Sequence, residues 1–343
     1  MKRNAISYLL VLVVSIFALP QAHAWDRGEV MRFATLPAGA THPEGIAADF
    51  QGNFYVADFA VGGTASGVGQ IVVLDRDGRT RRVLDISGSS TLLLGLDFHP
   101  ITRALMVIDF GGGKVLRVDP DTGASSVFMT VSGASGLNAL TFDAAGNVYV
   151  SDSAQGIIWK TGPGGGAATA WVTSPLLTTT GVPPFGANGL GFNKARNALF
   201  VANTGNDTIV RIPVTGGGAP GAPAVFVNSI NGADGLIIDE DDNLWVAANQ
   251  ADEIVVVDPS GRVIAKLGDF HGIDRKGSPR GLLFPASLVR VGHYIYITNL
   301  ALDLRLFGLP QAVDSQWAAE VKRHTISRIP ARIPSVRNGG DDD

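Results

Sequence analysis

The chain has 343 residues, of which 27 are Lys or Arg and 31 are Asp or Glu, so its formal net charge is −4. This balance, with no basic stripe along the sequence, argues against nucleic acids and anionic membranes as partners. Charged residues make up 17 % of the chain, below the roughly 25 % of average domains, while glycine occurs 43 times and cysteine not at all. Many short strands joined by tight turns explain this composition, and packing without disulfides must stabilise the fold.

Residues 1–24 have the features of a targeting segment. Lys2 and Arg3 form a positive start, an apolar run covers residues 8–19, and Ala22-His23-Ala24 is a cleavage site of the small-x-small type. The apolar run is too short to span a bilayer as a helix. We therefore expect a signal peptide that is cleaved before Trp25, and a mature protein that is periplasmic or secreted.

After this segment, residues 30–35 form an expected strand without a partner nearby in the sequence. Six repeats follow, each with an apolar strand that begins near a small residue, a turn rich in Asp, Asn and Gly, and a second strand that ends in Asp or Asn. The repeats run over residues 44–58, 94–109, 138–152, 188–203, 234–249 and 286–299. They begin 44 to 52 residues apart, the length of one blade of a β-propeller. The sequence predicts an all-β fold, a six-bladed β-propeller over residues 25–330, in which the N-terminal strand completes the last blade and closes the ring.

The rest of the chain is predicted to form loops and a tail. Three long loops rich in Gly or Pro, at 60–69, 173–187 and 267–284, follow a second strand or precede an inner one, so we expect them on one face, around a binding pocket. Apolar residues at 313, 317, 318 and 321 have the only helix-like spacing of the mature chain. Residues 331–343, rich in Pro, Gly and Asp, are expected to be disordered.

One position differs between the repeats in an informative way. The residue before the small one, here called the axial residue, is Glu44, Leu94, Asn138, Asn188, Asp234 or Ala286. Equivalent positions of a closed ring converge on its axis, so four oxygen-bearing side chains should meet there. Such a group favours Ca²⁺ or Mg²⁺ over Zn²⁺, whose sites rely on His and Cys. Alternatively, Asn-Gly and Asp-Gly are common turn dipeptides, and these side chains would bond to their own backbone.

Two further sets of polar residues stand out. The second strands end in Asp58, Asp109, Asp152, Asn203, Asn249 and Asn299. Because every repeat has such a residue, we interpret the set as turn caps rather than catalytic groups. His42 and His271 lie in loops of the expected functional face, where they could contact the substrate and shuttle protons, although an isolated histidine is more often structural or solvated.

Four phrases of the sequence resemble a known family. They are His42-Pro43-Glu44-Gly45, Leu137-Asn138-Ala139-Leu140-Thr141-Phe142-Asp143, Ala187-Asn188-Gly189-Leu190-Gly191-Phe192, and Ala233-Asp234-Gly235-Leu236-Ile237-Ile238-Asp239 followed by Asn243-Leu244-Trp245-Val246-Ala247. They are similar to the senescence marker protein/gluconolactonase family, which includes regucalcin and is similar in layout to diisopropyl fluorophosphatase. The resemblance spans the mature chain and implies a six-bladed propeller with one divalent cation in its channel.

The resemblance also implies roles for individual residues. Glu44, Asn188 and Asp234 would bind the metal, Asn138 would be a fourth ligand or a substrate contact, and Asp234 would act as catalytic base or nucleophile. Two features depart from the family pattern: the third repeat has Asn-Ala where lactonases usually have Asn-Asp-Gly, and residues 133–136 lack the basic residue expected there. Specificity for sugar acids therefore does not follow.

Two functions are compatible with these patterns. The first is an exported, monomeric, metal-dependent hydrolase that binds Ca²⁺ in preference to Mg²⁺ and cleaves a small lactone or related ester. The second is a non-catalytic propeller that resembles NHL-repeat proteins and binds a peptide, a glycan or a protein partner through the same face. Tight binding of one divalent cation in the channel would favour the first.

Overall fold

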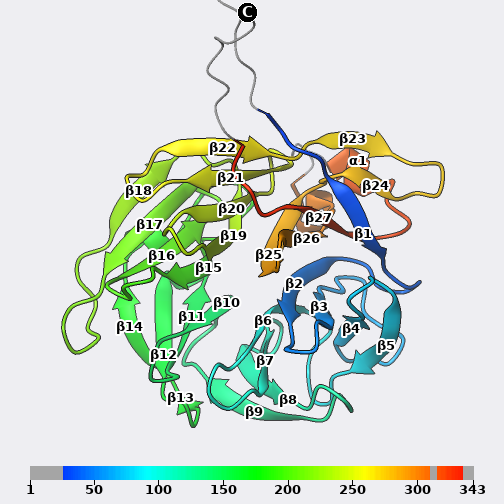
Figure 1. The fold of residues 1–343 in the computed structure, drawn as a ribbon. Helices are drawn as coiled ribbons and strands as arrows, with labels where there is room; N and C mark the ends of the chain where they lie inside the picture. Colours follow the sequence, from blue (N-terminus) through cyan, green and yellow to red (C-terminus); the bar gives the residue numbers. More distant parts are fainter. Residues whose placement is uncertain (1–25, 310–314, 335–343) are drawn as a thin grey trace, which may run out of the picture.

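The computed structural model describes residues 26–309 and 315–334, and these form a ring of six antiparallel sheets around a central channel (Figure 1). From the axis outward, the blades are β2 (Pro43–Ala48), β3 (Phe54–Asp58), β4 (Gln70–Leu74) and β5 (Thr80–Asp85); β6 (Leu93–Phe98), β7 (Leu105–Asp109), β8 (Lys114–Val118) and β9 (Ser125–Thr130); and β10 (Leu137–Phe142), β11 (Val148–Asp152), β12 (Ile157–Thr161) and β14 (Thr169–Thr173). They continue as β15 (Ala187–Phe192), β16 (Ala198–Asn203), β17 (Thr208–Pro213) and β18 (Ala224–Asn228); β19 (Ala233–Ile238), β20 (Leu244–Ala248), β21 (Glu253–Val257) and β22 (Val263–Leu267); and β25 (Pro285–Val291), β26 (Tyr294–Asn299), β27 (Thr325–Pro330) and β1 (Met31–Thr35). The predicted six-bladed β-propeller is confirmed.

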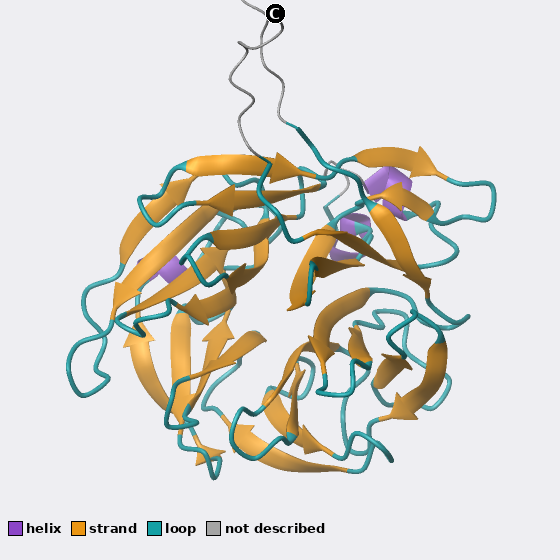
Figure 2. Ribbon diagram, in the orientation of Figure 1, coloured by secondary structure: helices purple, strands orange, loops and turns teal. Residues whose placement is uncertain are grey.

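The elements outside the blades are short (Figure 2). They are β13 (Gly166–Ala167), which extends the second blade beside β9, the hairpin β23 (Phe270–Ile273) and β24 (Pro279–Gly281), the 3-10 helices η1 (Pro175–Leu177) and η2 (Leu304–Phe307), and the helix α1 (Ser315–Ala318). Residues 310–314, in the predicted helical segment, lie outside the described residues. In the described part of that segment the structure has the helix α1. No helix among the described residues is long and apolar enough to cross a membrane.

The N-terminal strand closes the ring, as the sequence predicted. β1 pairs antiparallel with β27, so that Met31 faces Arg328 and Thr35 faces Thr325. Phe33 of β1 also packs against Phe54 of the first blade and Tyr296 of the last, with ring centroids 5.0 and 4.6 Å away. Since aromatic pairs at this separation stabilise beyond the area they bury, β1 holds the two ends of the ring together by hydrogen bonds and by packing.

Buried second strands and apolar layers between blades form the core. All five residues of β3, β7, β11 and β20 are buried. Neighbouring blades pack against both faces of each sheet. The cluster that includes Ile46, Phe54 and Ile326 bridges the first and last blades. Beyond the expected end of the propeller at residue 330, Ala331 and Ile333 pack against the core of the last two blades. The expected signal peptide, 1–24, and the remainder of the expected tail, 335–343, lie outside the described residues.

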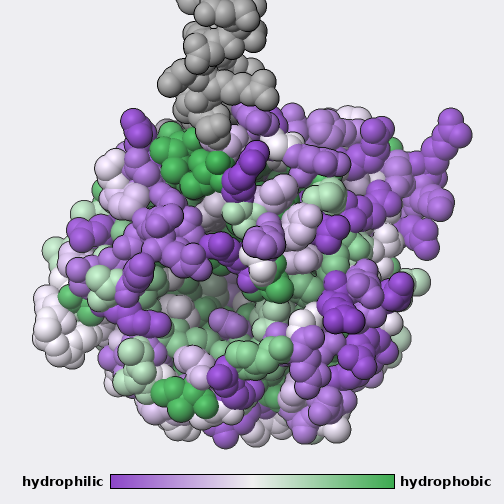
Figure 3. Space-filling model, in the orientation of Figure 1, coloured by the Kyte–Doolittle hydropathy of each residue, from purple (hydrophilic) through white to green (hydrophobic). Residues whose placement is uncertain are grey.

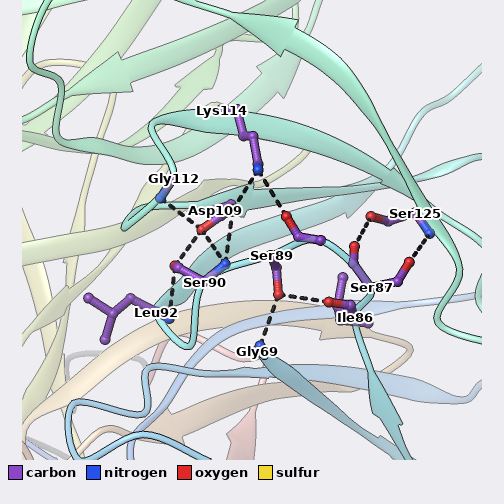
Figure 4. Close-up of polar contacts among 11 residues, drawn as sticks. Gly69, Ile86, Ser87, Ser89, Ser90, Leu92, Asp109, Gly112, Lys114 and Ser125 are labelled. Carbon is purple, nitrogen blue, oxygen red and sulfur yellow. Dashed lines mark hydrogen bonds and ion pairs between the residues drawn. The ribbon is translucent and has the colours of Figure 1, made fainter. Parts of the chain in front are cut away.

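The residues that end the second strands cap turns, as expected for most of them. Asp109 is the example in Figure 4: its carboxylate accepts hydrogen bonds from the backbone of Ser90 and Gly112 and lies 3.4 Å from the Lys114 ammonium. Asp152 likewise accepts from the N–H groups of Gly136 and Ala154. These caps fix the loops that connect neighbouring blades at the end of the channel where the axial residues lie.

Candidate functional site

A β-bulge in every inner strand turns the axial residues into the channel. In β2 the register shifts between Pro43 and Ile46, and the same shift recurs in β6, β10, β15, β19 and β25. The axial residue lies inside this bulge each time, and bulges commonly redirect a side chain next to a functional site. All six axial side chains are buried, and the four polar ones are only 4–5 % exposed.

The glycine that follows the axial residue is required by the neighbouring blade and not by a turn. A Cβ atom on Gly189 would lie 2.5 Å from the carbonyl oxygen of Asp234, and one on Gly235 would lie 2.5 Å from that of Ala286. Neither glycine has a positive φ. The alternative interpretation of Asn-Gly and Asp-Gly as turn dipeptides is therefore wrong here, because both pairs lie within inner strands. The glycines let adjacent backbones approach closely enough for the axial side chains to meet.

The polar axial residues line one cavity of about 30 Å³. Its walls are Glu44, Phe59, Leu94, Asn138, Pro183, Phe185, Asn188, Thr204, Asp234, Asn249, Phe284, Leu300 and Leu302. The structure thus brings together Glu44, Asn138, Asn188 and Asp234, which lie up to 190 residues apart in the sequence. On the other side of the axial residues, the channel widens into a hollow lined by an apolar residue of each inner strand, and the ring is hollowed near its centre in the space-filling view (Figure 3).

A second ring of residues surrounds the first. It consists of the residues directly after the second strands, Phe59, Phe110, Ser153, Thr204, Asn249 and Leu300. Asn249 belongs to this ring and not to the turn caps, so that part of the sequence interpretation is wrong. The register pairs Ala233 with Ala248 as it pairs Ala187 with Asn203, which places Asn249 one position further along and beside the cavity.

The second ring orients the amides of the first. The Ser153 hydroxyl donates to the carbonyl of Ala187, at 2.6 Å, and accepts from Nδ2 of Asn138, at 3.3 Å. Because its proton is already used, Ser153 can only accept from the amide, so Asn138 must turn its oxygen away from Ser153. Thr204 acts in the same way: it donates to the carbonyl of Ala233 at 2.8 Å and accepts from Nδ2 of Asn188 at 3.0 Å.

The carboxylates are held differently from the amides. Oδ2 of Asp234 accepts a hydrogen bond of 2.9 Å from Nδ2 of Asn249, whereas its Oδ1 has no partner. Burial raises the pKa of Asp234 to about 7, although hydrogen bonds from Asn249, Asn188 and the Gly235 backbone oppose this shift. Burial and, secondly, the neighbouring charge of Asp234 raise the pKa of Glu44 well above its usual range. Two buried carboxylates without a cationic partner are costly to ionise, and a bound cation would remove that cost.

The donor set of the cavity fits a hard divalent cation. Oε2 of Glu44, Oδ1 of Asn138, Oδ1 of Asp234 and Oδ1 of Asn249 are buried and make no hydrogen bond. Buried polar atoms nearly always have a partner, so four such oxygens around one cavity indicate a missing one. Carboxylate and amide oxygens are the ligands that Ca²⁺ and Mg²⁺ prefer. Among the described residues no group of three or more His, Cys, Asp and Glu side chains is clustered, which matches a donor set with only two acids.

The two predicted histidines do not line this cavity. The His42 ring packs against the His324 ring, with centroids 5.4 Å apart, and burial lowers the pKa of both. His271 is exposed on β23, in a separate hollow with Val30 and Arg32. The structure therefore places neither side chain among the groups that face the cavity.

Several residues of the site were not predicted from the sequence. Ser153, Thr204 and Asn249 could have been found by alignment of the residues that directly follow the second strands, which are polar in the third, fourth and fifth repeats only. The segment after β26, with Leu300 and Leu302, gave no comparable signal. Of the three long loops, 173–187 contributes Pro183 and Phe185, and 267–284 contributes Phe284.

Comparison with known families supports the resemblance. Residues 112–268, from the second to the fifth blade, match the model of the SMP-30/gluconolactonase/LRE-like region. This stretch is just under half of the chain and includes Asn138, Asn188 and Asp234. The family resemblance inferred from the sequence motifs is thereby confirmed. No curated protein matches the sequence.

Solved structures with the same fold have several activities. A gluconolactonase from Xanthomonas campestris superimposes with a TM-score of 0.64 at 16 % identity, over 89 % of this chain and 90 % of the other. The calcium-binding protein regucalcin from Agrobacterium tumefaciens gives 0.59 at 14 %, over 89 % and 97 %. Virginiamycin B lyase from Staphylococcus aureus gives 0.56 at 12 %, over 89 % and 99 %. At such identities the structural similarity shows the fold alone, and the function has to be inferred from the residues of the site.

Proposed function

We propose that this protein is an exported, metal-dependent hydrolase that opens a small lactone or cleaves a related ester. The family match and the gluconolactonase neighbour suggest a lactonase-type hydrolase. The observation that carries the proposal is a set of four buried oxygens, on Glu44, Asn138, Asp234 and Asn249, that belong to residues lining one cavity and make no hydrogen bond. A neutral binding pocket would have no need of converging acceptors without a donor.

One divalent cation would be held by oxygens of Glu44, Asn138, Asn188 and Asp234, and Ca²⁺ is preferred to Mg²⁺ because two of the four are amides and Ca²⁺ accepts such oxygens in a flexible geometry. When bound, such a cation polarises a carbonyl oxygen. Regucalcin, one of the structural neighbours, is named as a calcium-binding protein.

Asp234 is placed to handle the proton of the reaction. Asn249 holds one carboxylate oxygen, and the other faces the cavity without a partner. In the proposed step Asp234 takes a proton from water as the water oxygen bonds to the carbonyl carbon. The ring C–O bond then breaks, the departing oxygen takes up the proton, and the product is a hydroxy acid.

Metal analysis and a substrate panel test the proposal. The purified protein should contain about one Ca²⁺ per chain and hydrolyse lactones or phosphotriesters, and chelation should abolish turnover. Asp234→Asn should remove nearly all activity, whereas Asp241→Asn, an exposed change in the same blade, should not. A protein that binds no divalent cation and turns over no substrate of the panel would contradict the proposal and favour the non-catalytic, NHL-like binding propeller.

The orienting hydroxyls allow a sharper test. Ser153→Ala and Thr204→Val keep the side-chain volume nearly unchanged but remove the acceptor, so each should weaken Ca²⁺ binding by about 10- to 100-fold, as loss of ligand-orienting partners does elsewhere. Ser151→Ala is the matched control, because this buried serine of β11, two residues before Ser153, has its side-chain hydrogen bonds with the backbone of Ala139. Equal calcium affinities of Ser153→Ala and Ser151→Ala, measured by calorimetry, would remove the orienting role.

Export, a monomeric state and a small-molecule partner belong to the same proposal. Lys2, Arg3 and the Ala22-His23-Ala24 site support cleavage of residues 1–24. Mass spectrometry of the protein recovered outside the cytoplasm should give an N-terminus at Trp25, and sedimentation should give the mass of one chain. An intact leader on the mature protein would contradict export by this route.

A further inference from the structure

Four phenylalanines from separate loops form a closed ring over the cavity. Phe59 follows β3, Phe110 follows β7, Phe185 precedes β15, and Phe307 ends η2. Neighbouring ring centroids are 5.8 Å apart for Phe59 and Phe110, 6.4 Å for Phe110 and Phe185, 6.3 Å for Phe185 and Phe307, and 6.5 Å for Phe307 and Phe59. All four separations fall within the range of attractive aromatic contacts.

The phenylalanine ring lies between the cavity and solvent. Phe59 and Phe185 line the cavity, and they contact Phe110 and Phe307 further out. Phe307 is 39 % exposed and the adjacent Leu306 57 %, so large apolar side chains reach the surface at this point. Clusters of exposed apolar residues on a soluble protein commonly mark a binding site.

The apolar character continues down one side of the cavity. In the sixth blade the axial residue is Ala286 and the residue after the second strand is Leu300, and in the second blade these residues are Leu94 and Phe110. In the first blade the residue after the second strand is Phe59, and only the axial Glu44 is polar. The polar groups lie on the third to fifth blades and on Glu44. Among the described residues that line the cavity, none is Lys, Arg or His. A ligand would therefore meet oxygen atoms at one end and hydrocarbon at the other.

We infer that the substrate is a neutral lactone or ester with an apolar chain or ring, and not a sugar lactone. The inference rests on the proposed hydrolase and specifies its substrate. The reacting carbonyl would lie against the oxygens of Asn138, Asn188 and Asp234, and the apolar body against the four phenylalanines. The hydroxyl groups of a sugar lactone would lose their bonds to water against these rings and find no replacement. An anionic substrate would meet no cationic side chain.

Binding requires the phenylalanine rings to turn aside. The cavity of about 30 Å³ exceeds the space that one water needs by only a factor of two or three, so a lactone does not fit behind the closed ring. Phe307 is the most exposed of the four, and its ring contacts those of Phe59 and Phe185. Displacement of the Phe307 side chain would therefore open the cavity with the smallest loss of buried contacts.

A homologous series of substrates tests the inference. We would compare γ-valerolactone, γ-hexalactone, γ-octalactone and γ-decalactone with D-glucono-δ-lactone, using the calcium-loaded full-length mature protein. Each added methylene should raise kcat/KM by up to about fourfold, the value for complete transfer of one CH₂ out of water, until the chain fills the space. The sugar lactone should be the poorest substrate of the panel.

Variants at Phe307 separate binding from general damage. Phe307→Gln should flatten the gain per methylene, while Phe307→Leu, which keeps an apolar side chain, should retain most of the gain. Phe50→Gln is the control, because Phe50 is 72 % exposed in the turn between β2 and β3, away from the axial ends of the strands.

The outcomes distinguish this inference from the proposed function. Hydrolysis of the sugar lactone at least as efficient as that of γ-decalactone, with a flat series, would overturn the apolar specificity and leave a lactonase. If no lactone were hydrolysed, calorimetric titration of the γ-lactone series would decide: affinity that rises with chain length would support the apolar pocket although the hydrolase had failed. Absence of both turnover and binding would mean that the four phenylalanines are a permanent plug, and would overturn the inference.

Discussion

Replacement of Asp234 by asparagine should stabilise the metal-free protein at alkaline pH and destabilise the calcium-bound one relative to wild type. The side chain is 4 % exposed, and burial raises its pKa from 3.8 to about 7 in the folded state. A carboxyl group with a raised folded pKa contributes its stability below the unfolded pKa, and this contribution is lost as the pH rises through the folded pKa. Asparagine keeps the shape, can still accept from Asn249, and does not titrate.

The magnitude follows from the interval between the two pKa values. From pH 5 to about pH 7 the folded protein holds a proton on Asp234 that the unfolded chain does not. Each pH unit of this interval lowers the free energy of unfolding by about 1.36 kcal/mol, so wild type should lose about 2.7 kcal/mol between pH 5 and pH 8 through this group. Asp234→Asn should not show this loss. Because the charge of Asp234 also raises the pKa of Glu44, removal of that charge acts in the same direction.

Calcium should reverse the order of stability. A cation that binds the folded state only stabilises it by about 2.7 kcal/mol at 100 times its dissociation constant. Wild type at pH 8 should gain this amount, and the variant, with one formal ligand charge fewer, should gain less at the same concentration. At pH 5 protonation competes with the metal, so the gain of wild type should shrink as well.

Urea unfolding of metal-free wild type and Asp234→Asn at pH 5 and pH 8, repeated with Ca²⁺, measures these differences. Groups away from the site titrate over the same range in both proteins and cancel when the two are compared, whereas the altered pKa of Glu44 in the variant adds to the difference. Asp241→Asn controls for the loss of one exposed charge. A difference between wild type and Asp234→Asn that is the same at both pH values would show that Asp234 does not titrate in this interval, and the electrostatic reasoning would be wrong.

Three further predictions concern the scaffold. Gly189→Ala should destabilise by several kcal/mol and reduce calcium binding, because its Cβ would lie 2.5 Å from the Asp234 carbonyl oxygen. Gly164→Ala is the control and should be nearly neutral, because a Cβ there would lie in open space. Equal melting temperatures of the two variants would contradict the close approach of the blades. Burial and, secondly, the neighbouring His42 lower the pKa of His324 to about 3, so the folded protein keeps this side chain neutral. Stability that is present above pH 6.5 should therefore fall by about 2.5 kcal/mol between pH 7 and pH 4.5. In urea unfolding at these two pH values, His324→Phe should show a smaller decrease in the free energy of unfolding than wild type. A mature protein that begins at Leu36 should melt earlier and aggregate, since β27 and the seam aromatics lose β1; a monomer with unchanged melting temperature would rule out the closing role of that strand.

The number of blades and the identity of the axial residues could be read from the sequence, because both are repeated local patterns. A blade is a run of short antiparallel strands with turns at fixed intervals, and hydrogen bonds within a run of about 50 residues specify it. Ring symmetry then places equivalent positions on one axis, so that Glu44, Asn138, Asn188 and Asp234 could be grouped without any knowledge of the tertiary structure. The unpaired strand at 30–35 predicted the closure for the same reason, since a blade that lacks its outer strand needs one.

Tertiary structure alone decided what surrounds these residues. In the fifth blade the register pairs Ala233 with Ala248 and not with Asn249, so Asn249 lies one position beyond the expected turn cap, in the cavity wall. The direction of the Asn138 oxygen depends on Ser153 and on a carbonyl of the next blade, and the phenylalanine ring joins four loops from different blades. His42 and His271 lie on the expected face but point elsewhere, because the direction of a loop side chain is set by what packs against it. Contacts between blades have no fixed sequence separation. For this reason the sequence determined which residues reach the axis, while only the packed ring determined the walls of the cavity and the side chains that cover it.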